Sequence, residues 1–514
     1  MTEETDSVNI TPGAPRTTAR RWIVLITLLV LGFGLRLIDL TDPPLDFHPT
    51  RQLRAAIIAR GMYYEMTPDA DPILSAKAMQ LRATLESYEP QIFERLTALS
   101  YLVIGSETLW TARLFAILFW CLGGVFLFDL ARRMVSWDGG LVALAFYLLL
   151  PLAIDASRSF QPDPLVTLWI IVSLWTTYRW NQRRTWHWAL ATGIVVGLTL
   201  LIKPTAVFFL APAVTLLVLN IWGLRMVFRR WEVWVAFILV VLIPGSFYVA
   251  QKGQSAMNYI GFWTGSFYNL WMEPAFYVQW LKTLDRLFNL ALLVAGLASV
   301  ALFPTRGQRN AIFGMWLGYG VYGLYFPFQI RTHEYYSLMF VPVVALSLAP
   351  LGQQLIHTIR PRPLFWRAVA TAAVLVGAAY PVWITYTGLI GVDYATEAAA
   401  WTNMGEQLPQ DGQIIALTHD YGYRLGYYGW RHVQVWPNTD EQDMLAQRVS
   451  SNSGSDEEFE QEFITRTQGM DYFLITRFDQ LEAQPLLKDY LYTHYLIAAT
   501  GDGYLLFNLR APTP

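Results

Sequence analysis

Eleven apolar stretches follow one another between residue 22 and about residue 386, and the rest of the chain is more polar. An α-helix needs about 20 apolar residues to cross roughly 30 Å of hydrocarbon, and each stretch approaches that length. The stretches are residues 22–40, 109–131, 139–155, 164–180, 186–202, 205–222, 231–249, 286–303, 311–328, 336–355 and 365–386. The sequence therefore predicts an α-helical polytopic membrane protein with about eleven transmembrane helices.

The composition points away from soluble proteins and from nucleic-acid binding. Charged residues make up 15% of the chain, whereas soluble domains carry roughly 25%. The formal net charge is −2, so the chain as a whole has no electrostatic attraction to nucleic acid. The single cysteine, Cys121, excludes a disulfide within the chain.

Arginine clusters flank the predicted spans at alternate connections. If all eleven spans cross the membrane, every cluster falls on one side, and the positive-inside rule makes that side cytoplasmic. The clusters contain Arg20, Arg21, Arg132, Arg133, Arg179, Arg183, Arg184, Arg225, Arg229, Arg230, Arg306, Arg309, Arg360, Arg362 and Arg367. We therefore expect residues 1–21 to form a disordered cytoplasmic arm in a multi-pass protein of the cell (plasma) membrane, with the C-terminal region outside the cytoplasm.

The predicted transmembrane domain, residues 22–386, contains a long first outer loop at residues 41–108. Within this loop, residues 92–104 place apolar side chains at helical spacing. That spacing predicts an amphipathic helix lying along the membrane surface. A second outer loop, residues 250–285, is rich in aromatic residues.

Residues 387–514 are expected to form a small soluble extracytoplasmic α/β domain. Short runs of β-branched and aromatic residues predict strands, and Gly501-Asp502-Gly503 is a hairpin turn signal. The predicted strands are residues 414–417, 433–435, 472–475, 495–498 and 504–507, and the predicted helices are residues 398–407, 440–448 and 457–465. The sequence of residues 387–514 has no phosphate-binding loop, metal-ligand spacing or serine elbow, so it does not indicate a function for this domain.

A dense polar cluster follows the first span: Asp46, His48, Arg51, Gln52 and Arg54 fall within nine residues. Ionisable groups beside membrane spans are costly and are often functional. A carboxylate next to basic groups stays ionised and can act as a general base, while the basic groups hold an anionic phosphate. The alternative is an ordinary salt bridge in an interfacial loop.

Further polar residues occur at the outer ends of later spans. Asp163 precedes the fourth span and is either functional or a helix N-cap. Lys203 ends the fifth span and either binds an anion or extends to the interface. The remaining candidates for substrate binding are Glu89, Arg158, Arg331, His333, Glu334, Tyr335 and Tyr336. The alternative is that these residues belong to hydrated loops, to an aromatic belt or to the charged end of a helix.

The order of these motifs resembles a known family. Asp46 in the first outer loop is followed by the amphipathic segment, Arg113-Leu114-Phe115-Ala116, Ser157-Arg158-Ser159 ahead of Asp163, Leu201-Ile202-Lys203-Pro204 and His333-Glu334-Tyr335-Tyr336. This order is similar to that of the GT-C type glycosyltransferases that use polyprenyl-phosphate sugars, among them protein O-mannosyltransferases and lipid A aminoarabinose transferases. The resemblance covers residues 22 to about 386.

The resemblance implies roles for particular residues. The family's catalytic aspartate corresponds to Asp46, its second acidic position to Asp163 and its lysine after the fifth span to Lys203. Many relatives carry a second acid directly after the first, where this chain has Phe47. The pattern of Asp46 to Gln52 instead resembles an uncharacterised bacterial branch of the family.

We therefore expect a glycosyltransferase that moves a sugar from a polyprenyl-phosphate donor to a glycan, lipid or protein at the extracytoplasmic face of the membrane. Asp46 is the expected base, and Arg51, Arg54, Lys203 or Arg331 would hold the donor phosphate. No cofactor is firmly expected, and a divalent metal is left open. The alternative is a transporter or flippase. Two similar halves of the chain, with ionisable groups near the middle of the membrane, would indicate such a protein. Here the ionisable groups gather at one face instead.

Overall fold

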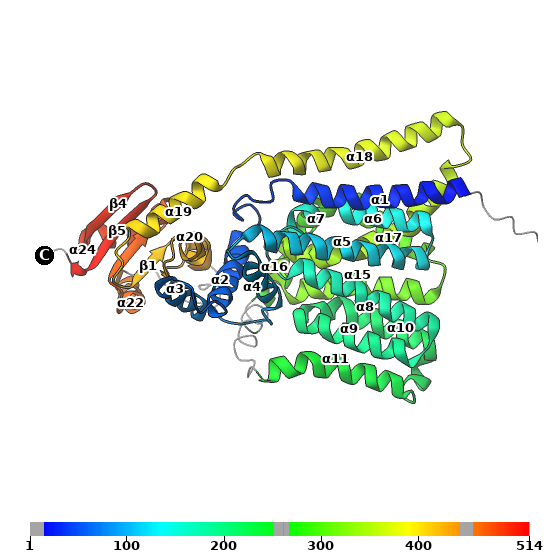
Figure 1. Ribbon diagram of the computed structural model, residues 1–514, viewed down its shortest axis with the longest axis horizontal. Helices are drawn as coiled ribbons and strands as arrows, with labels where there is room; N and C mark the ends of the chain where they lie inside the picture. Colours follow the sequence, from blue (N-terminus) through cyan, green and yellow to red (C-terminus); the bar gives the residue numbers. More distant parts are fainter. Residues whose placement is uncertain (1–14, 251–260, 262–266, 443–455, 513–514) are drawn as a thin grey trace, which may run out of the picture.

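The computed structural model describes residues 15–250, 261, 267–442 and 456–512. Most of the predicted N-terminal arm and parts of the outer loop at 250–285 and of the predicted helix at 440–448 lie outside the described residues. Figure 1 shows a bundle of long helices with a small sheet domain beyond one end of it. The helices of the first outer loop lie between the two (Figure 1).

Each of the eleven predicted stretches coincides with helical structure, so the predicted α-helical membrane fold is confirmed. The corresponding helices are α1 (Pro15–Leu37), α5 (Leu109–Met134), α6 (Trp137–Leu149) with α7 (Pro151–Ala156), α8 (Asp163–Arg183), α9 (Trp186–Ile202), α10 (Val207–Val227), α11 (Trp231–Ala250), α14 (Leu290–Ser299), α15 (Arg306–Tyr325), α17 (Val341–Ile359) and α18 (Leu364–Ile390).

By length and composition alone, five of the described helices qualify as membrane spans, or six if α13 (Pro274–Phe288) and the segment Leu290–Leu302, which bend by 86°, count as one. Some predicted spans are too polar for this criterion. In α8, Thr167, Ser173 and Thr177 are fully buried and hydrogen-bonded. A helix enclosed by other helices does not need an apolar surface. The number of eleven crossings therefore stays a prediction.

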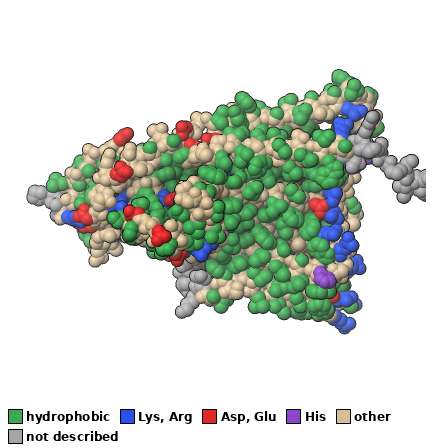
Figure 2. Space-filling model, viewed as in Figure 1, with side chains coloured by type: hydrophobic (Ala, Val, Ile, Leu, Met, Phe, Trp, Pro, Cys, Tyr) green, Lys and Arg blue, Asp and Glu red, His purple; other side chains and the backbone are tan. Residues whose placement is uncertain are grey.

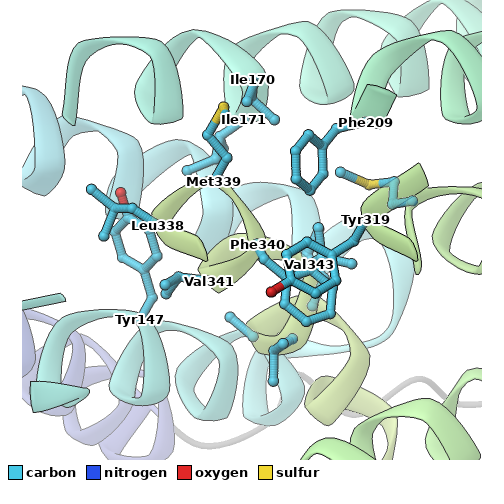
Figure 3. Packing of buried hydrophobic residues seen from close by; sticks show 14 of the residues in the cluster. Tyr147, Ile170, Ile171, Phe209, Tyr319, Leu338, Met339, Phe340, Val341 and Val343 are labelled. Carbon is cyan, nitrogen blue, oxygen red and sulfur yellow. The ribbon is translucent and has the colours of Figure 1, made fainter. Parts of the chain in front are cut away.

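The centre of the bundle is closed by a short segment that is not α-helical. The 3₁₀ helix η4 (Glu334–Phe340) inserts Leu338, Met339 and Phe340 among the long helices, and each of these residues is at most 1% exposed. Figure 3 shows this packing. The ring of Phe340 stacks on that of Tyr319 at 3.9 Å between centroids. The tight packing holds the residues at the start of η4 in place.

The outside of the bundle is apolar over a broad belt (Figure 2). In both α11 and α18, only 6% of the most apolar segment is buried inside the protein. Figure 2 also shows that Lys and Arg gather at the end of the bundle opposite the sheet domain. An apolar belt bounded by basic residues is the pattern of a protein that spans a membrane. The multi-pass membrane protein predicted from the sequence is confirmed.

The first outer loop forms three helices, α2 (Pro49–Glu65), α3 (Pro72–Ala83) and α4 (Ile92–Ile104). Helix α2 begins at Pro49, and α4 has the bounds predicted for the amphipathic helix. One side of α4 is buried, including Phe93 and Tyr101, whereas Val103 is 88% exposed. This two-sided character matches the predicted amphipathic helix.

The C-terminal region contains one five-stranded sheet of order β2-β1-β3-β5-β4. Strands β1 (Ile414–Leu417) and β3 (Tyr472–Ile475) have the predicted bounds. The other strands are β2 (Gln434–Val435), β4 (Tyr495–Gly501) and β5 (Tyr504–Pro512), and the helices are α19 (Ala395–Gln407), α20 (Tyr423–Tyr428), α22 (Asp456–Thr467), α23 (Phe478–Glu482) and α24 (Pro485–His494). The turn at Gly501–Gly503 joins β4 and β5 as an antiparallel hairpin. The small C-terminal α/β region is confirmed.

Helix α2 is held against the C-terminal region by Arg60, which is only 5% exposed. Its guanidinium lies 4.0 Å from the ring centroids of both Tyr427 and Trp430. It donates to the backbone carbonyl of Tyr427 at 2.6 Å and to the carboxylate of Glu107 at 3.0 Å. Stacking and planar hydrogen bonding suit arginine better than lysine. These contacts tie the sheet domain to the helix that carries Arg51 and Arg54.

Candidate active site

A cavity of about 420 Å³ lies where the first outer loop meets the ends of the long helices. Its volume is within the roughly 300–1,000 Å³ of ligand pockets in proteins. It combines basic, acidic and aromatic residues, and its wall includes Arg51, Arg54, Tyr88, Glu89, Glu94, Lys203, Thr205, Tyr248, Val249, Phe326 and Tyr336. The cavity thus collects side chains from widely separated parts of the chain.

Lys203 and Asp163 form a buried ion pair at the cavity wall. The Nζ atom of Lys203 donates to Oδ1 of Asp163 at 2.7 Å, and their side chains are 5% and 2% exposed. Lys203 stands at the C-terminal end of α9, where Pro204 stops the helix, and Asp163 is the first residue of α8. Asp163 therefore pairs with a cation and is not the N-cap that the sequence left as an alternative.

This pair has unused hydrogen-bonding capacity. The Oδ2 atom of Asp163 is buried with no hydrogen-bond partner in the described part of the chain. An ammonium group carries three donors, and the hydrogen bond to Asp163 accounts for one of those of Lys203. The Nζ atom lies 5.8 Å from the ring centroid of Tyr336, which also lines the cavity. The pair can therefore receive a further polar group from the cavity.

Helix α2 directs two arginines into the same cavity. Arg51 donates from Nε to the hydroxyl of Tyr335 at 3.2 Å and lies over the ring of that residue. Arg54 lies one turn further along α2, donates to the backbone carbonyl of Glu86 and covers the ring of Tyr88. Because residues three apart share a helix face, both guanidinium groups reach the cavity.

Two acids of the first outer loop complete the wall. Burial raises the pKa of the Glu89 carboxyl, although the nearby Lys203 and Arg51 oppose the shift. Burial also raises the pKa of Glu94 to about 7. A carboxyl with a pKa of about 7, such as that of Glu94, is protonated for part of the time near neutral pH and can then donate a hydrogen bond. The cavity therefore keeps an excess of positive charge that suits an anion.

Asp46 lies outside the set of residues that line this cavity. Its Oδ1 atom forms an ion pair with Arg113 at 3.3 Å and accepts hydrogen bonds from the Phe47 backbone N–H at 2.8 Å and from Gln52 at 3.4 Å. Arg113 is 2% exposed within α5, whereas Asp46 remains accessible. The side-chain oxygen of Gln52 also accepts from the backbone N–H of Phe160 at 3.0 Å. Gln52 thus links Asp46 to the segment before α8.

His48 and His333 form an aromatic group next to Arg51. Their rings stack at 6.0 Å between centroids, and the ring of Tyr335 meets that of His48 at 4.7 Å. Burial lowers the pKa of both imidazoles, that of His333 to about 4, and the charge of Arg51 contributes in each case. Both rings are therefore mainly neutral at physiological pH.

Three other predicted residues have partners away from the cavity. Arg331 donates to the side chain of Gln279 at 3.1 Å, and Glu334 pairs with Arg286 at 2.7 Å. Both partners belong to α13. Arg158 is 1% exposed and donates to the backbone carbonyl of Asp39. None of these three residues lines the cavity.

The structure adds residues that sequence reasoning did not select. Glu94 and Tyr88 line the cavity, and Arg113 is the ion-pair partner of Asp46. Arg113 carried a usable signal, because a charge inside an apolar span is costly and often functional. Among the described residues there is no group of three or more His, Cys, Asp or Glu that could hold a metal ion.

Residues 89–248 match the family model described as dolichyl-phosphate-mannose-protein mannosyltransferase. This part of the chain contains α4, Arg113, Asp163 and Lys203. No curated protein sequence matches the chain significantly.

Solved structures resemble nearly the whole chain. ArnT from Cupriavidus metallidurans in the apo state has a TM-score of 0.58 at 17% identity, covering 95% of this chain and 98% of that one. The same protein bound to undecaprenyl phosphate has a TM-score of 0.57 at 16% identity, with the same coverage of both chains. The archaeal oligosaccharyltransferase AglB from Archaeoglobus fulgidus was solved in complex with an inhibitory peptide and a dolichol-phosphate. It has a TM-score of 0.57 at 14% identity, covering 96% of this chain and 74% of that one.

These findings support the glycosyltransferase predicted from the sequence and give no support to the transporter alternative. The predicted resemblance is confirmed: this chain has the fold of the GT-C membrane glycosyltransferases that use polyprenyl-phosphate sugars.

Proposed function

We propose that the protein transfers a sugar from a polyprenyl-phosphate donor to an acceptor glycan, lipid or protein at the extracytoplasmic face of the membrane. The observation that carries the proposal is the cavity at the end of the bundle, with Arg51, Arg54 and Lys203 in its wall. Anionic phosphate is bound by charge-assisted hydrogen bonds, and these residues supply the donors. The fold, shared with proteins solved with undecaprenyl phosphate and dolichol-phosphate, supports the same class of donor.

The lipid tail of such a donor has a path beside this cavity. Tyr248 and Val249 of α11 belong to the cavity wall, and Val249 is 78% exposed. The helix that carries them is apolar and scarcely buried. A polyprenyl chain can therefore remain in the hydrocarbon while its phosphate reaches the cations.

The proposed reaction is a single displacement with inversion. Asp46 accepts the proton of the acceptor group, the acceptor atom bonds to the anomeric carbon, and the bond to the phosphate oxygen breaks. The electron pair leaves with the lipid phosphate, whose charge needs stabilisation more than protonation. Arg51, Arg54 and Lys203 provide that stabilisation, Glu89 and the neutral His333 offer hydrogen bonds to the sugar, and Asp163 orients Lys203. Arg158, Arg331 and Glu334 support the surrounding loops.

The reaction is tested with purified protein in vesicles that contain a synthetic polyprenyl-phosphate sugar. Arg51→Ala is expected to raise the donor concentration needed for half-maximal rate by about tenfold or more, because hydrogen bonds to charged groups contribute about 1.5–3 kcal/mol. Arg51→Lys keeps the charge without the planar fork and should weaken donor use less.

Arg431→Ala is the matched control, because Arg431 lies in the C-terminal region and does not line the cavity. Unchanged donor dependence in Arg51→Ala would place the phosphate site elsewhere. Mass spectrometry of cell-envelope glycans, with and without the protein, then identifies the sugar and the acceptor.

The proposed topology places residues 1–21 in the cytoplasm, residues 22–386 in the membrane domain and residues 387–514 outside. The basic residues at the end of the bundle opposite the sheet domain support it (Figure 2). A reporter that is active only outside the cytoplasm should be active when it is fused after Pro514. A reporter that is active only in the cytoplasm should be active when it is fused ahead of residue 1. Cytoplasmic signals at both ends would contradict the odd number of spans, and the reverse pattern would contradict the orientation.

A further inference from the structure

A second cavity, of about 610 Å³, lies at the basic end of the bundle, where α1, α6, α17 and α18 come together. This is the end opposite the sheet domain (Figure 2). Arg20, Arg21, Arg360 and Arg367 all line it. Four arginines from three parts of the chain therefore surround one space, and the proposed transfer reaction uses none of them.

The charge of this cavity is only partly compensated. Asp138 is the one acid in its wall; it accepts from Arg360 at 2.9 Å and lies 3.9 Å from Arg21. Among the described residues, Arg20 and Arg367 form no ion pair. Four positive charges against one negative charge leave an excess that attracts an anion.

The rest of the wall is apolar and open to the surroundings of the bundle. Val24 of α1 is 40% exposed, and Val374 and Leu375 of α18 are 70% and 63% exposed. Helix α18 lies at the edge of the bundle (Figure 1), and only 6% of its most apolar segment is buried. The cavity thus has a cationic part at the end of the helices and an apolar part that continues along them.

We propose that this cavity binds the headgroup of an anionic phospholipid, with the acyl chains lying between α1 and α18. The volume is within the roughly 300–1,000 Å³ range of ligand sites. Basic pockets between transmembrane helices near the cytoplasmic surface attract anionic headgroups, and each Lys or Arg strengthens binding by about fivefold. Neither a zwitterionic lipid nor free phosphate matches both the charge and the apolar wall. The bound lipid fills the space beside α18 and fastens it to α1.

The test uses the purified full-length protein in detergent, mixed with equal amounts of dioleoylphosphatidylglycerol and dioleoylphosphatidylcholine. Native mass spectrometry counts the retained lipids. The wild-type protein should retain phosphatidylglycerol preferentially, even in excess inorganic phosphate. The double variant Arg360→Gln/Arg367→Gln should bind it on the order of 25-fold more weakly, because two arginines are lost.

The control is Arg229→Gln/Arg230→Gln, which removes the same charge from a connection that does not line the cavity. It should retain the lipid as the wild type does. Arg367→Gln alone breaks no ion pair recorded among the described residues; it should weaken binding about fivefold, and it replaces the double variant if that variant does not fold. Equal retention of the two lipids, equal retention by the cavity variants and the wild type, or displacement by phosphate would overturn the proposal.

Discussion

Replacing Asp46 by Asn is expected to lower the turnover of the lipid-linked donor by roughly 100-fold or more, the usual contribution of a general base. The substitution keeps the size of the side chain and removes its charge. Asp46 is accessible, and its buried partner Arg113 also donates to the backbone carbonyls of Asp39 and Leu40, so the variant should fold and bind donor much as the wild type does. Steady-state rates at several donor concentrations separate turnover from donor binding.

The cavity acids provide the comparison for this variant. Glu89 is not the expected base, and glutamine keeps the size and the hydrogen-bonding capacity of its side chain, so Glu89→Gln should reduce turnover much less. A near-normal rate in Asp46→Asn together with a large loss in Glu89→Gln would transfer the role of base to Glu89. A large loss in Asp163→Asn alone would transfer it to Asp163.

Replacing Lys203 by Met is expected to lower the free energy of unfolding by about 3–5 kcal/mol, because Asp163 would be left buried without its counter-charge. Removing both charges in Asp163→Asn/Lys203→Met should restore most of this stability, since a neutral pair needs no charge partner. Donor use should stay impaired in the double variant because the ammonium group is still absent. Thermal unfolding in detergent and donor titrations measure the two effects separately.

Lys488 offers a matched control, because it also lies 2.7 Å from a carboxylate, that of Glu482, but on the surface. Lys488→Met should leave stability nearly unchanged, because exposed pairs contribute little. A stable Lys203→Met protein would contradict the account of the buried pair. Wild-type donor dependence in the double variant would remove Lys203 from the phosphate site and leave Arg51 and Arg54.

Many elements of the fold could be predicted because their signals are contiguous in the chain. A run of apolar residues indicates a membrane helix wherever it packs, and the alternation of apolar and polar residues in α4 records its two environments. The strands β1 and β3 were predicted at their observed bounds for the same reason. The number of membrane crossings was harder to predict, because an enclosed helix such as α8 needs no apolar surface.

The resemblance in motif order led to the correct fold, because the motifs stand at the ends of successive spans. It also selected Lys203 and Asp163 individually. That these two residues form an ion pair was not evident, since they are 40 positions apart. Asp46 and its partner Arg113 are separated by 67 positions. Pairing over such distances depends on how the helices pack, which no local pattern records.

By itself, the sequence determined that the chain is a multi-pass membrane protein with a small α/β region and that its polar candidates lie at the ends of spans. Hydropathy and turn chemistry are properties of neighbouring residues, so they can be read from the sequence without knowledge of the packing. Only the tertiary structure decided which candidates share a cavity: it brought Arg51, Arg54, Glu89 and Lys203 together and gave Arg331 other partners. The physical reason is that a cavity is enclosed by the packing of distant segments, which sets the burial and the charge partners of each residue.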